Sequence, residues 1–262
     1  MQTSHLTGSS EFSHHAACPD CGSSDGLAVY TDEHTYCFVC HAWTPGNGSE
    51  QSPKRNTIMN YAGSAVRLNK RNLSEKTCEK FKIYRDGDTL RFHYHNADGQ
   101  VIGAKTRSKS KVFSYEGETD GSFFGQHLWR PTGKRITITE GELDAASCLE
   151  IATTWAVVSL PSGAASAKKS IQKNLQFLQG YDQIVLFFDN DDAGIEAARS
   201  AAAVLPPGKV YIARLNDYKD ASDALQANDY DALTRAYWDA KPFRPDGIVD
   251  GKSLLDIVTS PQ

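Results

Sequence analysis

Carboxylate side chains follow two short apolar runs that lie about fifty residues apart in the chain. The run at residues 136–139 ends in Glu140, and the run at residues 184–188 ends in Asp189 and Asp191. Runs of this length, rich in β-branched and aromatic residues, are typical of buried strands in a parallel sheet. Because the carboxyl ends of parallel strands share one edge, where ligands bind, we expect these acids to lie close together.

Several carboxylates in one crevice repel one another, so either one binds a proton or a cation offsets the charge. Mg²⁺ suits this edge, because proteins hold it with one or two carboxylates, water and substrate phosphates. Asp220 follows a predicted strand and could join the site. Glu142 and Asp144 lie in the first turns of a predicted helix, where acids suit the helix dipole, so Glu142 alone is ambiguous. The alternative is that these acids only cap the amino ends of helices, a position that Asp favours.

The elements around these acids predict a doubly wound α/β domain. Predicted strands at 136–139, 155–160, 184–188 and 209–215 alternate with predicted helices at 141–151 and 193–205 and with one helix from Asp220 to Trp238. A turn of small residues before Lys168 and Lys169 opens a further helix. These lysines and the backbone N–H groups of the turn are candidates for binding an anion.

Four cysteines near the N-terminus have the spacing of a zinc ribbon. Cys18 and Cys21 form one C-x-x-C pair, Cys37 and Cys40 form the second, and fifteen residues separate the pairs. Four thiolates would close a tetrahedral shell around one structural Zn²⁺ and leave no open position for chemistry. Disulfides are the alternative, but no signal peptide or membrane-spanning run is present, which favours an intracellular chain with reduced thiols.

Charge is distributed unevenly along the chain. The net charge of −4 divides into −6 for residues 1–53, which contain no Lys or Arg, +7 for residues 54–132, and −5 for residues 133–262. The predicted ribbon therefore cannot bind nucleic acid through phosphates and would have to read base edges, with Asp32, His34, Tyr36 and Trp43 as candidates. A role in folding or docking alone is the alternative. His5, His14 and His15 are expected to form a mobile leader.

The basic segment centres on a predicted hairpin that follows a short helix capped by Ser74. Asp98 and Gly99 mark its turn, between strands at 89–95 and 101–113. Basic residues recur at every second position of the second strand and should project from one face: Lys105, Arg107, Lys109 and Lys111. A ladder of like charges repels itself, which favours binding to a phosphate backbone or a triphosphate over an ordinary solvated face.

The order of these parts resembles the primase half of the T7-like phage primase–helicases, and the carboxylate-edged domain resembles the toprim fold. The cysteine pairs carry the resemblance together with D-E-H-T-Y-C at 32–37, T-E-G-E-L-D at 139–144, S-G-A-A-S-A-K-K at 162–169 and F-D-N-D-D-A-G at 188–194. It implies an α/β fold with a toprim-type parallel-sheet core, an α+β basic subdomain and a separate N-terminal zinc ribbon. The expected boundaries are 1–45 for the ribbon, 46–62 for a flexible linker, 63–132 for the basic subdomain, 133–242 for the toprim subdomain and 243–262 for the start of a linker to a helicase domain.

The resemblance implies template-directed synthesis of short RNA primers on single-stranded DNA for phage replication, by two-metal nucleotidyl transfer. Glu140, Asp144, Asp189 and Asp191 would be catalytic, and Asp220 would join Glu140, Asp189 and Asp191 in binding two Mg²⁺ ions. Whether Glu140 is a ligand or the base toward the primer hydroxyl stays open. Asp32 and His34 would read the template, and the basic residues from Lys105 to Lys111 would hold template phosphates and the incoming nucleotide. Glu33 replaces a glycine of the T7 relative, which leaves the recognised triplet open.

The implied partners are single-stranded DNA, ribonucleoside triphosphates, a hexameric replicative helicase and a DNA polymerase that accepts the primer, without a membrane, in the cytoplasm of an infected bacterial host. No G-x-x-x-x-G-K-S/T phosphate loop of a helicase motor occurs in this sequence. Two alternative functions stay open: a toprim nuclease, which would use the same acids to cut DNA, and a non-catalytic DNA-binding adaptor of a replicative helicase.

Overall fold

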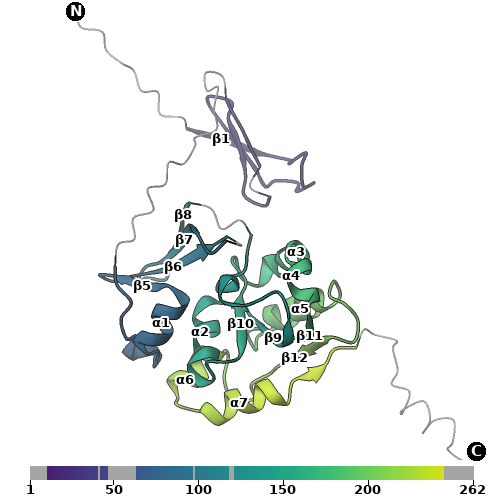
Figure 1. Cartoon of the computed structure of the whole chain (residues 1–262). Coiled ribbons are helices and arrows are strands. Elements are labelled where there is room, and N and C mark those ends of the chain that lie inside the picture. The colour runs from purple at the N-terminus through teal and green to yellow at the C-terminus, as the bar shows by residue number, and fades with distance from the viewer. Residues whose placement is uncertain (1–10, 41, 47–62, 97, 118–120, 245–262) are drawn as a thin grey trace, which may run out of the picture. The chain divides into compact units, whose positions relative to one another are not determined.

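The computed structural model describes residues 11–40, 42–46, 63–96, 98–117 and 121–244 (Figure 1). The chain divides into two compact units, Met1–Asn56 and Thr57–Gln262. The predicted linker at 46–62 lies outside the described residues except for Gly46, and the predicted linker at 243–262 lies outside them except for Phe243 and Arg244. No helix among the described residues has the length and apolar content needed to cross a membrane.

The first unit is a four-stranded antiparallel sheet in the order β1-β2-β3-β4. The segment between the cysteine pairs contains a hairpin, in which β2 pairs with β3. The prediction of a mobile leader is wrong for His14 and His15, which lie in β1 opposite Val29 and Ala28, and His5 lies outside the described residues. Backbone hydrogen bonds hold this mostly exposed strand, so its sequence has no apolar alternation to reveal it. The strands are β1 (Phe12–Ala16), β2 (Leu27–Tyr30), β3 (Thr35–Cys37) and β4 (Trp43–Thr44).

The second unit begins with a short helix and an antiparallel sheet in the order β5-β6-β7-β8. After the 3-10 turn η1 (Asn69–Arg71), α1 (Glu75–Phe81) starts at Ser74, whose hydroxyl accepts a hydrogen bond from the Thr77 N–H at 3.3 Å, as predicted. The predicted hairpin is confirmed as β6 and β7. The strands are β5 (Ile83–Asp86), β6 (Thr89–His95), β7 (Val101–Arg107) and β8 (Phe113–Gly117).

The prediction of four basic residues on one strand face is wrong. Strand β7 ends at Arg107, so only Lys105 and Arg107 share its face, and Lys109 and Lys111 lie in the turn that leads to β8. The hydroxyl of Ser108 accepts a hydrogen bond from the Val112 N–H at 3.1 Å. Serine hydroxyls that bond to nearby backbone groups favour turns over strands, and Ser108 closes this one.

The second sheet of this unit is five-stranded, in the order β10-β9-β11-β12-β13. Its first four strands are parallel, as the sequence predicts, and only β13 runs antiparallel. The 3-10 turn η2 (Gln126–Leu128) precedes it, and the strands are β9 (Gly133–Thr139), β10 (Ala156–Ser159), β11 (Tyr181–Phe187), β12 (Val210–Ile212) and β13 (Lys241–Pro242).

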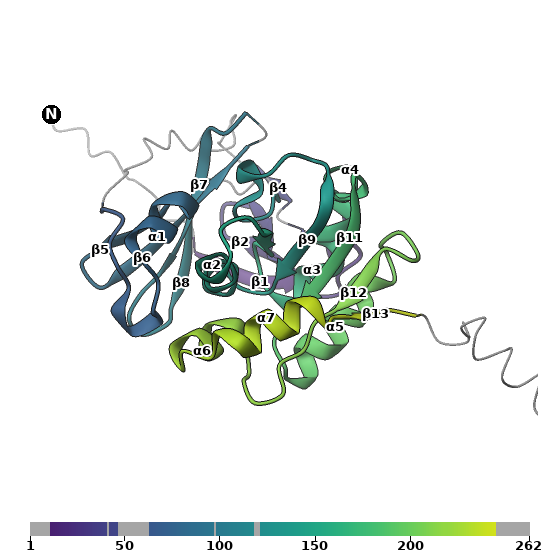
Figure 2. The same ribbon diagram turned by 60° about the horizontal axis from the view of Figure 1, so that its bottom comes forward.

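Helices cover both faces of the parallel sheet, as expected for a doubly wound domain (Figures 1 and 2). The single helix predicted from Asp220 to Trp238 is wrong, because the chain breaks at Asn228, which adopts a left-handed φ of 60°, and Asp229 caps a new helix. Asn tolerates this conformation and Asp is a strong cap, so the two together end one helix and begin another. The helical elements are α2 (Glu142–Ile151), the 3-10 turn η3 (Ala164–Ser166), α3 (Ala167–Lys173), α4 (Leu175–Gln179), α5 (Asp192–Ala202), α6 (Ala221–Gln226) and α7 (Tyr230–Trp238).

Two apolar cores lie on opposite faces of the parallel sheet. One contains Ile136 and Ile184 from the strands together with Ala198 from α5. The other joins Phe92 of the antiparallel sheet to Leu149 of α2, so both sheets share it. Figure 2 shows α2 between the two sheets. The shared core therefore couples the basic segment to the acidic domain in one folding unit.

Replacing Phe124 by Ala should test this coupling. Phe124 is fully buried in the shared core, with ring centroids 5.3 Å from Phe81, 5.8 Å from Phe92 and 5.6 Å from Tyr94. We expect the free energy of unfolding, measured by denaturant titration of the whole chain, to fall by about 3–5 kcal/mol.

The matched control is Tyr230→Ala, because this aromatic side chain is 47% exposed. It should cost no more than about 0.5 kcal/mol. Equal losses for the two variants would contradict the shared core.

Candidate active site

The acids predicted from the two apolar runs meet at the carboxyl edge of the parallel sheet. Strands β9 and β11 are neighbours, with Thr139 opposite Phe187, so Glu140 and Asp189 follow adjacent strand ends. The carboxylate of Asp191 caps α5 by accepting a hydrogen bond from the Gly194 N–H at 2.9 Å. A Cβ at Gly194 would lie 2.2 Å from the carbonyl oxygen of Asp189, so the turn that presents these acids requires glycine there.

Asp144 and Asp220 extend this cluster toward α6. Asp220 caps α6 by accepting a hydrogen bond from the Asp223 N–H at 2.7 Å. Asp144 is buried in the first turn of α2, and its Oδ1 accepts a hydrogen bond from the Ser222 N–H at 3.0 Å. The sequence left two alternatives for these acids, capping a helix or joining the acidic cluster. Asp191 and Asp220 each cap a helix and also belong to the cluster.

Burial and neighbouring negative charge raise the pKa of three of these acids, whereas hydrogen bonds from the Gly194 N–H and from Lys219 lower the pKa of Asp191. Burial and then the charge of Asp189 raise the pKa of Glu140. Burial and then the charge of Asp220 raise the pKa of Asp144 well above its usual range. The pKa of Asp189 is also raised by burial, even though a nearby lysine acts in the opposite direction. The edge thus holds more negative charge than its own surroundings neutralise.

Lys219 is the cation that lies between two of these acids. Its Nζ is 3.2 Å from Oδ2 of Asp189 and 3.2 Å from Oδ2 of Asp191. The Lys219 side chain is 55% exposed, so water screens the interaction and the ammonium group has room to move. Lys219 directly precedes Asp220 in the sequence, but no local pattern there predicts its contact with Asp189 and Asp191.

The donors at this edge suit a divalent cation. They are hard oxygen ligands, and Oε2 of Glu140 is buried without a hydrogen-bond partner, whereas Oε1 accepts a hydrogen bond from the Ala164 N–H at 3.3 Å. Within the described residues, however, no three acidic groups place their oxygens within 4.8 Å of one another. The carboxylates are arranged around Lys219, so the ammonium group and an incoming ion would compete for Asp189 and Asp191.

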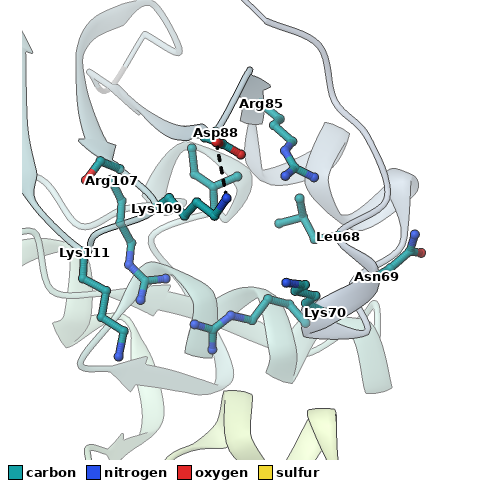
Figure 3. A pocket seen from close by; sticks show the side chains of 11 residues that line it. Leu68, Asn69, Lys70, Arg85, Asp88, Arg107, Lys109 and Lys111 are labelled. Carbon is teal, nitrogen blue, oxygen red and sulfur yellow. Dashed lines mark ion pairs between the residues drawn. The ribbon is translucent and has the colours of Figure 1, made fainter.

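A basic pocket of about 390 Å³ lies in the same unit, between η1 and the end of β7 (Figure 3). Asp88 is the one acid in its lining, and its carboxylate lies 3.6 Å from the Nζ of Lys109. Nε of Arg107 is buried without a hydrogen-bond partner, which leaves a donor for an anion. Sequence reasoning found Arg107, Lys109 and Lys111, but it missed the other three cations of the lining, Lys70, Arg71 and Arg85.

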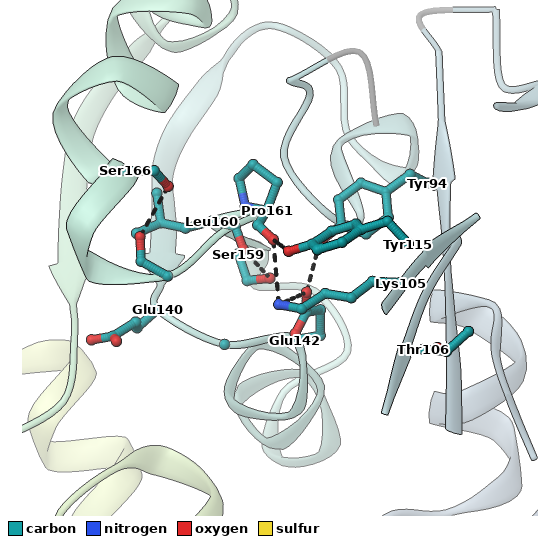
Figure 4. Close-up of polar contacts among 12 residues, drawn as sticks. Tyr94, Lys105, Thr106, Tyr115, Glu140, Glu142, Ser159, Leu160, Pro161 and Ser166 are labelled. Atoms are coloured by element: carbon teal, nitrogen blue, oxygen red, sulfur yellow. Dashed lines mark hydrogen bonds and ion pairs between the residues drawn. The ribbon is translucent and has the colours of Figure 1, made fainter. Parts of the chain in front are cut away.

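Lys105, a candidate for binding phosphates, lies in a buried contact between the basic hairpin and α2. Lys105 is 8% exposed, and its Nζ lies 2.9 Å from Oε1 of Glu142 and 3.3 Å from the carbonyl oxygen of Pro161 (Figure 4). The hydroxyl of Tyr94 donates to the same Glu142 oxygen at 2.7 Å. A buried ion pair is tolerated when hydrogen bonds satisfy both partners, as they do here. Figure 4 also shows Glu142 pointing toward Lys105 and Glu140 pointing away from it.

Lys168 and Lys169 are exposed at the start of α3, directly after η3. The N–H of Ala164 in η3 donates to Glu140, so this loop touches the carboxylate edge. The structure therefore places both lysines on the helix that follows a loop in contact with the acidic cluster.

The four predicted zinc ligands come together in the first unit. Their sulfur atoms all lie within 4.8 Å of one another, with 3.6 Å between Cys18 and Cys40 and 3.7 Å between Cys21 and Cys37. A tetrahedron with Zn–S bonds of about 2.3 Å has S–S edges of about 3.8 Å, so the cluster fits zinc. The Cys40 N–H, which donates to the Cys37 sulfur, lowers the pKa of this thiol to about 6. A lowered thiol pKa favours the thiolate that a metal needs.

Of the four candidates for template reading, Asp32 and His34 lie in the turn between β2 and β3, whereas Tyr36 and Trp43 lie in strands of the sheet. Nδ1 of His34 lies 2.6 Å from Oδ1 of Asp32, and its ring stacks on Tyr30 with centroids 4.0 Å apart. Tyr36 of β3 lies opposite Trp43 of β4. Between Asp32 and His34, Glu33 has a φ of 67°, a conformation that favours glycine.

Comparison with known proteins agrees with these features. Residues 137–225 match the family described as Toprim-like. The chain is 37% identical over 273 aligned residues to a DNA helicase/primase of Enterobacteria phage T3, covering 94% of this chain and 47% of the relative. The chain therefore spans about half the length of this curated relative.

Two solved structures from bacteriophage T7 are also similar. The primase fragment of the T7 primase–helicase protein is 34% identical, with a TM-score of 0.67, and the match covers 87% of this chain and 100% of the fragment. Primase domains in a complex with the T7 lagging-strand DNA polymerase are 36% identical, with a TM-score of 0.64 over 69% of this chain and 93% of theirs. The resemblance expected from the motifs is confirmed: the chain belongs to the T7-like family of phage primase–helicases and matches its primase part.

Proposed function

We propose that this chain is a DNA primase that synthesises short RNA primers on single-stranded DNA. The observation that carries the proposal is the pairing, in one folding unit, of a carboxylate edge suited to divalent cations with a pocket lined by six cations. Membership of the phage primase–helicase family supports the same activity. Phosphoryl transfer needs positioning and charge stabilisation more than proton chemistry, and this pair of features supplies both.

Each part of the unit has a role in this proposal. Glu140, Asp189, Asp191 and Asp220 would hold two Mg²⁺ ions, which supply charge stabilisation for the attacking hydroxyl and the leaving pyrophosphate when bound. Asp144 would orient Asp220 and the start of α6 from its buried position. The cations of the basic pocket, with Lys168 and Lys169, would hold the triphosphate and the template backbone. The Lys105–Glu142 pair would fix the basic hairpin against α2 and so set the distance between phosphates and carboxylates.

The first unit would hold one structural zinc and select the template, with base contacts from Asp32, His34, Tyr36 and Trp43. A T7 structure contains primase domains bound to an RNA/DNA hybrid and dTTP and interacting with a DNA polymerase, and the T3 relative is named a helicase/primase. By analogy, a replicative helicase and a DNA polymerase are the proposed partners here, in the cytoplasm of the infected bacterial host. The proposed segments keep the expected boundaries: ribbon 1–45, linker 46–62, basic subdomain 63–132, toprim subdomain 133–242 and linker 243–262.

Asp189→Asn should abolish primer synthesis. The variant loses one negative charge at the centre of the carboxylate edge, so incorporation of labelled ribonucleotides on single-stranded DNA should fall by at least about 100-fold. Binding of the DNA should change by less than about twofold, because the basic pocket is intact.

The control is Asp182→Asn, which alters an exposed acid at the opposite end of the same strand and should leave synthesis unchanged. Full synthesis by Asp189→Asn would refute the role of the carboxylates. Shortened DNA without new RNA, with the unaltered chain, would instead identify a nuclease. DNA binding without either product at any Mg²⁺ or Mn²⁺ concentration would identify a non-catalytic adaptor.

Lys219→Met should strengthen the response to Mg²⁺. Without added Mg²⁺ the variant leaves Asp189 and Asp191 without their cation, so its melting temperature should fall below that of the unaltered chain. Because no ammonium group then competes for the two carboxylates, saturating Mg²⁺ should raise the melting temperature more in the variant. A smaller Mg²⁺-induced shift in Lys219→Met would show that Lys219 does not compete with the ion.

Asp144→Asn should stabilise the metal-free chain at neutral pH. The pKa of Asp144 is raised on folding, so the folded state holds this proton more tightly than the unfolded state does. The unfolding free energy without added Mg²⁺ should therefore rise as the pH falls from 8 through the folded pKa. Denaturant titrations at several pH values should show a higher midpoint for Asp144→Asn at pH 8 and a weaker rise on acidification. An unchanged pH profile would contradict the burial of a charged Asp144.

A further inference from the structure

Strand β8 exposes two aromatic rings on one face at the margin of the antiparallel sheet. Phe113 and Tyr115 are two residues apart, so they project from the same face, and they are 49% and 45% exposed. The strand is the last in its sheet and pairs only with β7 among the described strands. Large apolar side chains that lie together on an exposed surface often mark a binding site.

Cations lie against both rings. Arg107 is directly opposite Phe113 and Lys105 is directly opposite Tyr115 in the register of β7 and β8. The guanidinium carbon of Arg107 is 5.8 Å from the ring centroid of Phe113, and Nζ of Lys105 is 4.9 Å from the same centroid. The hydroxyl of Tyr115 donates to the carbonyl oxygen of Pro161 at 3.2 Å, which anchors its ring beside Lys105 (Figure 4). The rings are therefore held in place before any ligand arrives.

Arg107 also connects the rings to the basic pocket. It lines that pocket beside Lys109 and Lys111 (Figure 3), and its Nε is buried without a hydrogen-bond partner. A ligand that matches this surface has a flat apolar ring next to negative charge. An apolar protein segment would bring the six cations of the pocket no compensating charge. A nucleotide brings both the ring and the charge.

We propose that Phe113 and Tyr115 form a base-stacking subsite, with the phosphates of the same nucleotide or strand directed toward Arg107 and the basic pocket. This subsite rests on the proposed function, because it places a nucleobase next to the Lys105–Glu142 pair and so near the carboxylate edge. Stacking on an aromatic ring tolerates every base, since each base has a π face. The subsite would thus add affinity without adding sequence preference.

The decisive variant is Phe113→Ala in the full chain. We expect it to weaken binding of ATP, of a single-stranded oligodeoxynucleotide, or of both, by about 5- to 150-fold, the scale of one base–aromatic stack. Inorganic tripolyphosphate should bind as tightly as before, because the basic pocket keeps its cations. Loss for ATP alone would assign the subsite to the incoming nucleotide, and loss for DNA alone would assign it to the template.

Phe113→Trp provides the matched conservative change. It should bind within about threefold of the unaltered chain, and its added tryptophan emission should be quenched by ATP or DNA but not by tripolyphosphate. Val112→Ala, which removes an exposed aliphatic neighbour, should bind both ligands normally. Melting temperatures near that of the unaltered chain would show that each variant folds.

Unchanged binding of both ATP and DNA by Phe113→Ala would overturn the subsite, as would an equal loss for tripolyphosphate. These outcomes can be distinguished from a failure of the proposed function. Primer synthesis by the unaltered chain, together with normal binding by Phe113→Ala, would refute the subsite and keep the primase. If the unaltered chain makes no primers but Phe113→Ala weakens binding, the primase would be refuted and nucleotide stacking on Phe113 would stand.

Discussion

Repulsion among carboxylates at one edge of the parallel sheet is the constraint on which the rest of this structure depends. The pairing of β9 with β11 brings Glu140 beside Asp189, and burial raises the pKa of both. A fold gains nothing from collecting like charges unless a cation offsets them. Lys219 offsets part of the charge, with its ammonium group 3.2 Å from a carboxylate oxygen of both Asp189 and Asp191.

The basic half of the second unit is positioned by a different interaction. Lys105 and Glu142 form a buried pair that Tyr94 and the carbonyl of Pro161 complete. The pair ties the hairpin of β6 and β7 to α2, which begins two residues after Glu140. The pair thus forms a buried contact between the basic hairpin and the domain that carries the acids. Breaking one partner would leave the other charge buried and unpaired, which is costly.

Much of this fold follows from the sequence, because its patterns are local. Alternation of apolar runs with helix-type sequence predicts the parallel sheet, paired cysteines predict the sulfur cluster, and Ser74 predicts the start of α1. The failures have equally local causes. Basic residues at every second position from Lys105 to Lys111 suggested one long strand, but Ser108 closes a turn among them. Asn228 and Asp229 interrupt a pattern that suggested one continuous helix.

Tertiary contacts account for what the sequence could not reveal. Nothing in the pattern around Lys105 shows that its partner is Glu142, thirty-seven positions later, and nothing around Lys219 shows that it bridges two acids of another strand end. The cations of η1 reach the basic pocket only because Arg71 and Asn72 bond to α6 and its C-terminal end, about 150 residues away in the chain. The positions of β1 and β8 also depend on pairing with a neighbour, because both strands are mostly exposed and bury no apolar face of their own.

The most direct test of the central claim is the number of Mn²⁺ ions that the zinc-loaded chain binds in the presence of a ribonucleoside triphosphate, counted by electron paramagnetic resonance. The account predicts two ions per chain in excess of those that the free nucleotide holds, and their loss when Glu140→Gln and Asp189→Asn are combined. A stoichiometry that stays the same in the double variant would show that the acids do not hold the ions, and the account would be wrong.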